Sequence, residues 1–266
     1  MDKASMTADY IPLHITSVCT LRCRHCGNGF PKYKPQRHSE KQIIISTLEK
    51  VFSIFNNVTE LRIAGAEALL HPDIGEIMAE AAKYSKQFER MVVVTNGTYV
   101  PRASVLSAIA GLQCNAIVYV NDYGKLSVKL EEVLEGLRNY GIKADLRHYN
   151  DEKQYYGGWI DLGIDEFSKK NYPPKKLTEV FRVCRKNYYV FDGRTYGCCP
   201  ASALYETGFL PPPSSDYVDM LSEKTVEEKR AVIAKLFDRP YLACGYCNGY
   251  DVENGKRIKA AEQIGE

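Results

Sequence analysis

Three cysteines near the start of the chain are spaced as ligands on one short loop. Cys19, Cys23 and Cys26 form the pattern C-x3-C-x2-C. Three thiolates on such a loop can bind three irons of a [4Fe–4S] cluster, which proteins otherwise hold with four cysteines. The fourth iron then has no protein ligand, so it can bind a small molecule and pass an electron to it. The triplet therefore predicts a cluster that carries out chemistry rather than one that only stores electrons.

Zinc binding, disulfide formation and simple burial are the other uses that the nine cysteines allow. A zinc site usually shows two C-x2-C-like pairs, and one C-x3-C-x2-C triplet does not complete a tetrahedral set. Disulfides are not expected, because the polar stretch Met1–Met6 does not resemble a secretory leader. A cluster is therefore the interpretation that we favour for the triplet.

The composition bounds the class of protein. The chain has 266 residues, 45% of them hydrophobic, which is enough for one substantial core with a smaller appendage. Acidic and basic residues are mixed along it and the formal net charge is +2, so no nucleic-acid partner is expected. No apolar run approaches the length of a membrane span, and no membrane partner is expected. These observations predict a cytoplasmic protein.

The first 150 residues alternate short apolar runs with amphipathic segments, which predicts parallel strands joined by helices. Helices are expected to begin at the capping patterns Ser39–Gln42 and Asp73–Glu76, and near Ala103 and Ser127, with Phe55 on the apolar face of the first. The pattern fits an open sheet or a partial barrel, and in both the functional residues gather at the carboxyl ends of the strands. The expected strands cover residues 11–15, 61–64, 91–95, 116–120 and 142–146.

The pattern changes after about residue 150. Residues 151–174 are polar and aromatic, and we expect them to link two parts of the chain or to face a substrate. Two short runs flank Asp192-Gly193, which is a strong signal for a β-hairpin. Thr225–Glu228 is a capping box for one more helix, and the tail from Val252 is expected to be helical.

The cysteine triplet resembles the signature of radical S-adenosylmethionine (SAM) enzymes, and a second segment supports this resemblance. Gly65-Ala-Glu67-Ala68 is similar to the Gly-Gly-Glu-Pro segment of the family, with Ala66 and Ala68 as departures. The resemblance implies that the open iron binds SAM, which is cleaved to a 5′-deoxyadenosyl radical. It also implies that Gly65 belongs to the SAM site and that the Glu67 carboxylate accepts from the SAM amino group.

Polar residues at three further strand ends occupy matching positions. Thr95-Asn96-Gly97 resembles the turn that contacts the SAM ribose or carboxylate in the family. Asn121 and Arg147 follow the fourth and fifth expected strands. Arg147 could clamp the SAM carboxylate, since a guanidinium suits bidentate pairing. It could equally be a solvated charge.

The second half resembles the small auxiliary-cluster domain called twitch, a relative of the SPASM domain. Its pattern matches Cys184, Cys198 in the hairpin, and the pair Cys244 and Cys247. The resemblance implies a second [4Fe–4S] cluster with four cysteine ligands, and a four-cysteine zinc site is the alternative. Cys199 could replace Cys198 as a ligand, donate a hydrogen atom to a substrate radical, or be an incidental buried thiol.

Together the resemblances imply a fold and a division of the chain. The fold is α/β, a partial (β/α) TIM-like barrel of five to six parallel strands followed by a small β-hairpin plus helix auxiliary-cluster domain. The radical SAM core is expected to cover residues 1–165 and the twitch/SPASM-like domain residues 166–266.

The resemblances also imply a reaction. One twitch cluster on a short core is similar to the layout of 2-deoxy-scyllo-inosamine dehydrogenase, and other segments look like small radical SAM proteins of glycan pathways. The leading hypothesis is an oxidoreductase acting on a sugar, cyclitol or nucleotide-sugar alcohol, with residues 155–161 lining its pocket and a flavodoxin or ferredoxin as electron donor. A radical epimerase, a maturase of ribosomal peptides and a non-catalytic electron carrier or zinc scaffold are the alternatives.

Overall fold

One mixed sheet organises the molecule. The computed structural model describes residues 6–150, 157–212 and 215–265. Its eight strands follow the order β5-β4-β3-β2-β1-β6-β7-β8. Strands β1 to β5 pair in parallel, β6 is parallel to β1, and β7 and β8 are antiparallel additions. The strands are β1 (Met6–His14), β2 (Phe55–Ala64), β3 (Phe88–Thr95), β4 (Ala116–Asp122), β5 (Lys143–His148), β6 (Tyr189–Phe191), β7 (Arg194–Tyr196) and β8 (Tyr217–Asp219).

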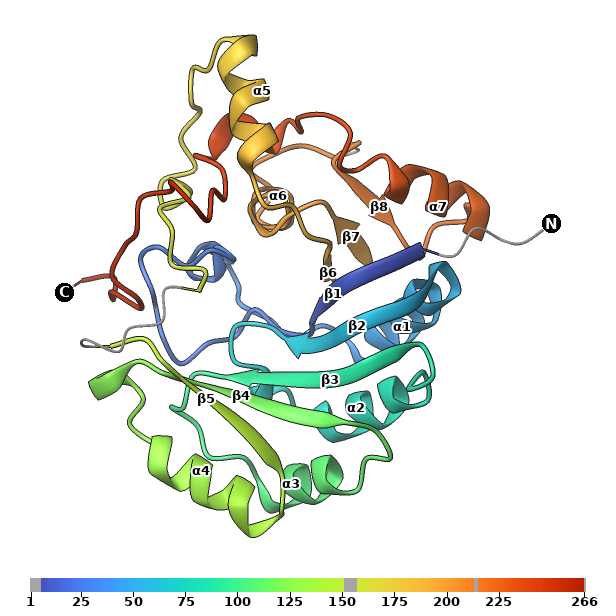
Figure 1. Cartoon of the computed structure of the whole chain (residues 1–266), viewed down its shortest axis with the longest axis vertical. Coiled ribbons are helices and arrows are strands. Elements are labelled where there is room, and N and C mark those ends of the chain that lie inside the picture. The colour runs from blue at the N-terminus through green and yellow to red at the C-terminus, as the bar shows by residue number, and fades with distance from the viewer. Residues whose placement is uncertain (1–5, 151–156, 213–214, 266) are drawn as a thin grey trace.

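Four helices cover the outer face of the parallel strands, as Figure 1 shows. They are α1 (Lys41–Ile54), α2 (Ile74–Ala82), α3 (Ala103–Ala110) and α4 (Leu130–Asn139). Alternate strand residues such as Leu61, Ile63 and Met91 are fully buried in the main core against these helices. The other face of the sheet looks toward the cysteine loop and the C-terminal segment. The predicted α/β fold, a partial barrel with five to six parallel strands, is confirmed.

The C-terminal part continues the same sheet. It contains α5 (Pro174–Val183), α6 (Cys199–Glu206), α7 (Val226–Ala234) and the 3₁₀ helix η5 (Ala243–Tyr246). The predicted hairpin is confirmed: Asp192 and Gly193 join β6 to β7 with φ angles of 48° and 81°. Leu13 of β1 pairs with Val190 of β6. A second apolar cluster joins Phe30 to C-terminal residues, so packing crosses the expected boundary at residue 165.

The capping box predicted at Ser39 and Gln42 is wrong. The residue before α1 is Glu40, no side chain caps the helix, and Gln42 donates to Ser46 instead. Ser39 is held in extended backbone, because its N–H donates to Ile15 and its carbonyl oxygen contacts His71 Nε2. Its hydroxyl is buried and has no partner among the described residues.

Other element ends also shift. Phe55 begins β2 rather than extending α1, and Asp73 precedes α2 without a side-chain hydrogen bond. The fourth helix begins at Leu130, because the Ser127 hydroxyl donates to the Asn96 carbonyl. The capping box of Thr225 and Glu228 at α7 is confirmed.

The predicted helical tail is wrong. Residues 252–265 form turns and bridges, and Gln263 pairs with Cys23 in an isolated antiparallel bridge. The tail therefore follows the cysteine loop instead of coiling on itself. Within the described ranges, the helices are too short or too polar to cross a membrane.

Candidate functional site

The cysteine triplet and the residues where α6 begins open on one cavity at the carboxyl ends of the strands. This cavity has a volume of about 380 Å³ and is lined by strand-end residues such as His14, Ala64 and Thr95. Three of its cysteines come from the triplet and two from the region where α6 begins. They are Cys19, Cys23, Cys26, Cys198 and Cys199. We call this space the cysteine cavity.

The triplet loop is fixed by backbone contacts with β2. Ala66 N donates to the Thr16 carbonyl at 3.0 Å, and Glu67 N donates to Val18 at 3.0 Å. Gly65 has a φ of 153°, and a Cβ there would stand 2.6 Å from the Thr16 carbonyl oxygen. Only glycine therefore allows this approach. Gly65 and Ala66 both line the cysteine cavity.

The triplet thiols suit a bound cationic cluster. Burial raises the pKa of Cys19 to about 11 and that of Cys23 to about 12, and the neighbouring thiols of the set add to both shifts. Burial also raises the pKa of Cys26. Three buried thiolates side by side repel one another unless positive charge is placed among them, which the irons of a cluster would do.

Polar groups already reach two of the sulfurs. Leu21 N donates to Cys19 Sγ at 3.4 Å, and Asn96 Nδ2 lies 3.7 Å from the same sulfur. Gln263 Nε2 lies 3.5 Å from Cys23 Sγ, and its Oε1 accepts from Arg22 N at 2.7 Å. Hydrogen bonds to sulfur tune the potential of a cluster. The tail residue Gln263 was missed by sequence reasoning, because nothing local connects it with Cys23.

The surroundings of Glu67 give it a structural role, and its expected contact with the SAM amino group stays a prediction. Its side chain is fully buried, and its carboxylate accepts from Leu69 N at 3.3 Å, Thr95 Oγ1 at 3.1 Å and Asn96 N at 2.8 Å. Burial raises the pKa of Glu67 to about 7, against the opposing effect of these hydrogen bonds. The residue is absent from the cavity lining. Glu67 therefore holds the turn that carries Asn96, while the backbone of Gly65 and Ala66 faces the cavity.

The remaining residues of the predicted SAM site divide into two groups. Asn96 and Asn121 line the cysteine cavity, as expected from their strand ends. Arg147 does not line it, which removes the expected clamp from this cavity. The Arg147 guanidinium lies 3.5 Å from the centre of the Tyr119 ring and bonds Asp145 at 3.0 Å. It lines an adjacent cavity instead.

Three cysteines of the second set share one feature, a backbone N–H directed at the sulfur. Tyr250 N donates to Cys184 at 3.2 Å, Tyr241 N to Cys244 at 3.3 Å and Gly249 N to Cys247 at 3.3 Å. Burial, followed by the Cys244 thiol, raises the pKa of Cys198 well above its usual value. Beyond burial, Cys244 and Cys247 both raise the pKa of Cys198, and Cys184 raises the pKa of Cys244 and of Cys247, so the four thiols are neighbours. A second cluster held by them stays a prediction.

Cys199 lies between the two sets. Burial raises the pKa of its thiol, and Cys247, Cys26 and Cys184 add to the shift in that order. Within the described ranges, no three His, Cys, Asp or Glu side chains converge on the position of a single metal ion. A cluster needs a wider arrangement, since each thiolate binds a different iron. Whether Cys198 or Cys199 is the fourth ligand stays a prediction.

The cavity also contains polar residues that sequence reasoning missed. His14 stacks on Tyr189 with ring centres 4.0 Å apart, and both line the cavity. His14 Nδ1 and the Tyr189 hydroxyl are buried without a hydrogen-bond partner among the described residues. Burial lowers the pKa of His14 to about 3, so its ring is neutral. Of the expected pocket segment, Trp159 lines the cavity, and residues 155 and 156 lie outside the described residues.

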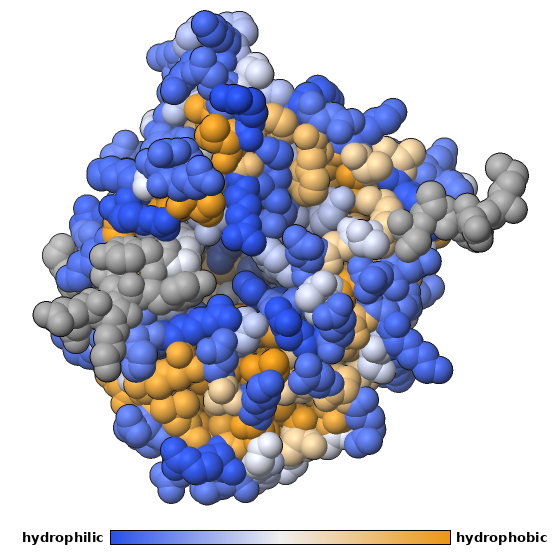
Figure 2. Space-filling model, in the orientation of Figure 1, coloured by the Kyte–Doolittle hydropathy of each residue, from blue (hydrophilic) through white to orange (hydrophobic). Residues whose placement is uncertain are grey.

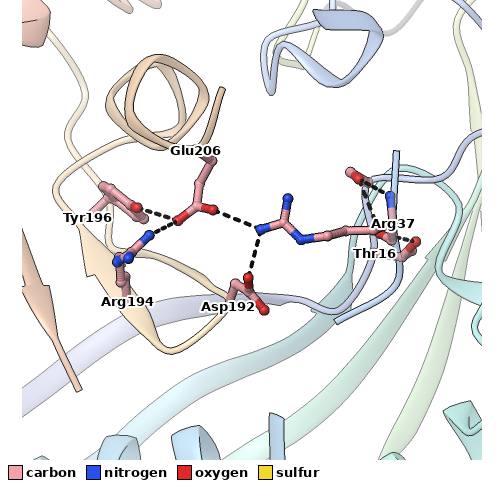
Figure 3. Close-up of polar contacts among 7 residues, drawn as sticks. Thr16, Arg37, Asp192, Arg194, Tyr196 and Glu206 are labelled. Atoms are coloured by element: carbon pink, nitrogen blue, oxygen red, sulfur yellow. Dashed lines mark hydrogen bonds and ion pairs between the residues drawn. The ribbon is translucent and has the colours of Figure 1, made fainter. Parts of the chain in front are cut away.

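An ionic network joins the β6–β7 hairpin and α6 to Arg37, as Figure 3 shows. Glu206, at the end of α6, accepts from Arg194 at 2.9 Å, Tyr196 at 2.6 Å and Arg37 at 3.2 Å. Arg37 also bonds Asp192 in the hairpin turn at 2.7 Å. The Arg37 carbonyl accepts from residues 16 and 17, which lead into the cysteine loop. The network therefore helps to set the distance between the two cysteine sets.

Comparison with known proteins adds a family and a set of relatives. A family model described as the Radical SAM superfamily matches residues 13–197. The GTP 3′,8-cyclase of Helicobacter pylori is 26% identical over an alignment that covers 82% of this chain and 77% of that protein. The GTP 3′,8-cyclase of Clostridium acetobutylicum is 29% identical, but only over 42% of this chain and 35% of that protein. The chain thus matches between about a third and two fifths of the length of the first relatives.

Solved structures give the same fold. The crystal structure of BtrN in complex with AdoMet and 2-DOIA matches 98% of both chains with a TM-score of 0.53 and 16% identity. The native anSMEcpe structure with bound AdoMet and Kp18Cys peptide matches 97% of this chain and 93% of that one, with a TM-score of 0.56 and 12% identity. At these identities the likeness concerns the fold alone.

Proposed function

The chain belongs to the radical SAM superfamily, and from that premise we propose that it oxidises an alcohol carbon of a sugar, cyclitol or nucleotide sugar. The family implies a [4Fe–4S] cluster and SAM, which when bound supply a 5′-deoxyadenosyl radical. The observation that carries the proposal is that Cys198 and Cys199, where α6 begins, line the same cavity as the triplet. A hydrogen atom leaves the substrate carbon to the radical, and one proton and one electron must follow to give the ketone. The second set, in the role of an electron-accepting cluster, lies where it could receive that electron.

The residues of the chain have separate parts in this proposal. Cys19, Cys23 and Cys26 would hold the first cluster, and the backbone of Gly65 and Ala66 with the amides of Asn96 and Asn121 would contact SAM. Asn96 is fixed for this by Glu67 and by its bond to Thr20 Oγ1 at 3.1 Å. Trp159, which packs edge-on against Tyr123, would form an apolar wall for the substrate.

A radical epimerase is the second candidate, and the position of Cys199 favours it. Its thiol lines the cavity, and burial raises its pKa, so the sulfur keeps its hydrogen. Such a thiol could return a hydrogen atom to the opposite face of a substrate radical. In that case no electron leaves the substrate.

The relatives widen the set of substrates to test. Two of them are GTP 3′,8-cyclases, and anSMEcpe was crystallised with a peptide. GTP and a cysteine-containing peptide therefore belong in the panel beside sugars and cyclitols.

The experiment is anaerobic reconstitution followed by incubation with SAM, a strong reductant and the panel in deuterated water. We expect 5′-deoxyadenosine and a ketone two mass units lighter than its alcohol. Deuterium at a carbon of inverted configuration would replace the dehydrogenase with the epimerase. A reconstituted protein that holds iron but never forms 5′-deoxyadenosine would reject both.

A further inference from the structure

A second cavity adjoins the cysteine cavity on the inner face of the sheet. It has a volume of about 730 Å³ and is lined by Asp9, Glu60 and Arg90 within β1, β2 and β3 and by Asn121 and Arg147 near the carboxyl ends of β4 and β5. Tyr10, Arg62, Asn121 and Arg185 are among the residues that line both spaces, so the two are continuous. No cysteine lines the second cavity. Figure 2 shows a hollow in the middle of this face of the molecule with hydrophilic residues around much of its rim.

Arginine dominates the described lining of this second cavity, which we call the arginine basin. Its guanidinium groups come from β2, β3, β5 and two C-terminal segments: Arg62, Arg90, Arg147, Arg185 and Arg257. Asp9 and Glu60 are the acidic residues among its described lining. Even with Asp145, which bonds Arg147 from outside the lining, the described groups leave an excess of positive charge.

Glu60 is already fully engaged. Its carboxylate accepts from Arg62 Nε at 2.7 Å, from Arg90 Nε at 3.0 Å and from the Tyr119 hydroxyl at 2.9 Å. Burial opposes its ionisation, but Arg62 and these hydrogen bonds together lower the pKa of Glu60. One ionised carboxylate therefore serves two guanidinium groups. Glu60 alone therefore cannot balance the positive charge of the arginine basin.

Arg185 stands at the junction of the two cavities. Its backbone N–H donates to the Tyr250 carbonyl at 2.8 Å, which fixes the start of its side chain. The side chain is exposed and takes part in none of the ion pairs found among the described residues. A cleft with charge of one sign concentrates ligands of the opposite sign.

We propose that the arginine basin binds the phosphate or diphosphate group of an anionic substrate. Guanidinium forks match phosphate oxygens in bidentate geometry, and the five described arginines of the lining carry more positive charge than Asp9, Glu60 and Asp145 balance. The alcohol carbon of the same molecule would then reach the cysteine cavity past Arg62 and Arg185. The position of the alcohol carbon rests on the proposed function. The binding of phosphate narrows the substrate class to phosphate esters and sugar nucleotides.

Binding can be measured without turnover. Calorimetry with inorganic pyrophosphate, UDP-glucose and methyl glucoside would compare charged and uncharged probes on the reconstituted protein. Trp159 is the single tryptophan of the chain and lines the cysteine cavity, so its fluorescence reports whether the sugar end arrives there. We expect pyrophosphate and UDP-glucose to compete for one site, binding to weaken with added salt, and methyl glucoside not to bind.

Variants locate the site. Arg185→Gln and Arg257→Gln should each weaken pyrophosphate binding about tenfold, the loss expected for one charged hydrogen bond. Arg182→Gln, three residues away on α5 and absent from both linings, is the matched control and should bind as the parent does. Measurement of the iron content checks that Arg185→Gln does not disturb iron binding by the neighbouring Cys184.

Unchanged affinity in both variants, or equal binding of methyl glucoside, would overturn the proposal. If SAM is the only compound that competes with pyrophosphate, the arginines belong to the cofactor site, and the proposal is also overturned. Formation of 5′-deoxyadenosine by the same preparations is scored separately. A loss of anion binding with intact SAM cleavage thus distinguishes failure of this inference from failure of the proposed function.

Discussion

At the scale of residues, burial decides what each polar group can do. Glu67 lies in the segment where the family resemblance places a SAM ligand, yet three protein donors occupy its carboxylate. The residue has become a brace between the loops after β2 and β3. A carboxyl group buried in this way prefers to be neutral, and this preference has a consequence for stability.

The stability of the protein should depend on the titration of Glu67. Its pKa rises from 4.5 to about 7 on folding, so the folded state holds the proton more tightly. The protein therefore loses stability as pH rises from about 4.5 to about 7, by up to about 3 kcal/mol from this group. Urea unfolding of the parent and of Glu67→Gln at pH 5 and pH 7.5 measures it. Relative to the parent, the variant should have a more favourable free energy of unfolding at pH 7.5 than at pH 5. A difference in this free energy that does not change with pH would contradict the burial argument.

The two cysteine sets should fail in different ways. Replacing Cys19, Cys23 or Cys26 by Ala should abolish formation of 5′-deoxyadenosine, whereas Cys184→Ala or Cys247→Ala should reduce turnover more than cleavage. In the proposed arrangement each set would hold four irons, so each variant should lose about half of the iron. Comparison of Cys198→Ala with Cys199→Ala then identifies the fourth ligand. We expect iron loss in Cys198→Ala only; iron loss in Cys199→Ala alone would exchange their roles, and circular dichroism checks folding.

At the scale of elements, short contacts between distant segments hold the cysteine loop. The hairpin of β6 and β7, helix α6 and the segment before α1 meet at Glu206, whose side chain is 2% exposed. The C-terminal tail reaches the same loop from its other side, where Arg24 N donates to the Glu262 carbonyl at 2.7 Å. Each of these contacts can be removed without touching a cysteine.

Removal of Arg37 should loosen the hairpin. Arg37→Gln leaves the buried Glu206 carboxylate with Arg194 and Tyr196 only, and we expect a loss of about 1–2 kcal/mol after allowing for the 40% exposure of the Arg37 side chain. Lys41→Gln breaks an exposed pair with Glu76 and should leave the urea midpoint of unfolding unchanged. Urea unfolding of both variants tests the comparison. Equal losses would mean that the network adds nothing beyond a surface ion pair.

The tail should protect the first cluster. Gln263→Ala removes the amide beside Cys23 Sγ and the acceptor of Arg22 N. We expect iron to leave the triplet several times faster under a chelator, because the loop loses both contacts. The rate is measured in the Cys184→Ala background, where only the first site is expected to hold iron. The released iron then comes from the triplet. Glu253→Gln, an exposed change elsewhere in the tail, should release iron at the parent rate.

At the scale of the whole molecule, one sheet serves both halves of the chain. Because β6 pairs with β1, the second cysteine set is delivered to the carboxyl edge of the parallel strands. The same alternation of side chains that buries Leu61 and Ile63 turns Glu60 and Arg62 to the inner face, where they form the arginine basin. The charged residues Glu60 and Arg62 at alternate positions of β2 were a signal in the sequence that could have indicated this surface.

Local patterns were sufficient wherever the interaction is local. Four features depend on neighbours within a few residues, so the sequence alone determined them. They are the spacing of Cys19, Cys23 and Cys26, the alternation of strands with helices, the Asp192-Gly193 turn and the capping box at Thr225. The position of Ser39, the path of the tail and the burial of Glu67 were decided only by tertiary structure. Each depends on partners that are far away in the chain, such as Ile15 for Ser39, Cys23 for Gln263 and Asn96 for Glu67. Spacing could indicate that two cysteine sets exist, but only the packing of the sheet could decide that Cys198 and Cys199 face the same cavity as the triplet, beside the arginine basin.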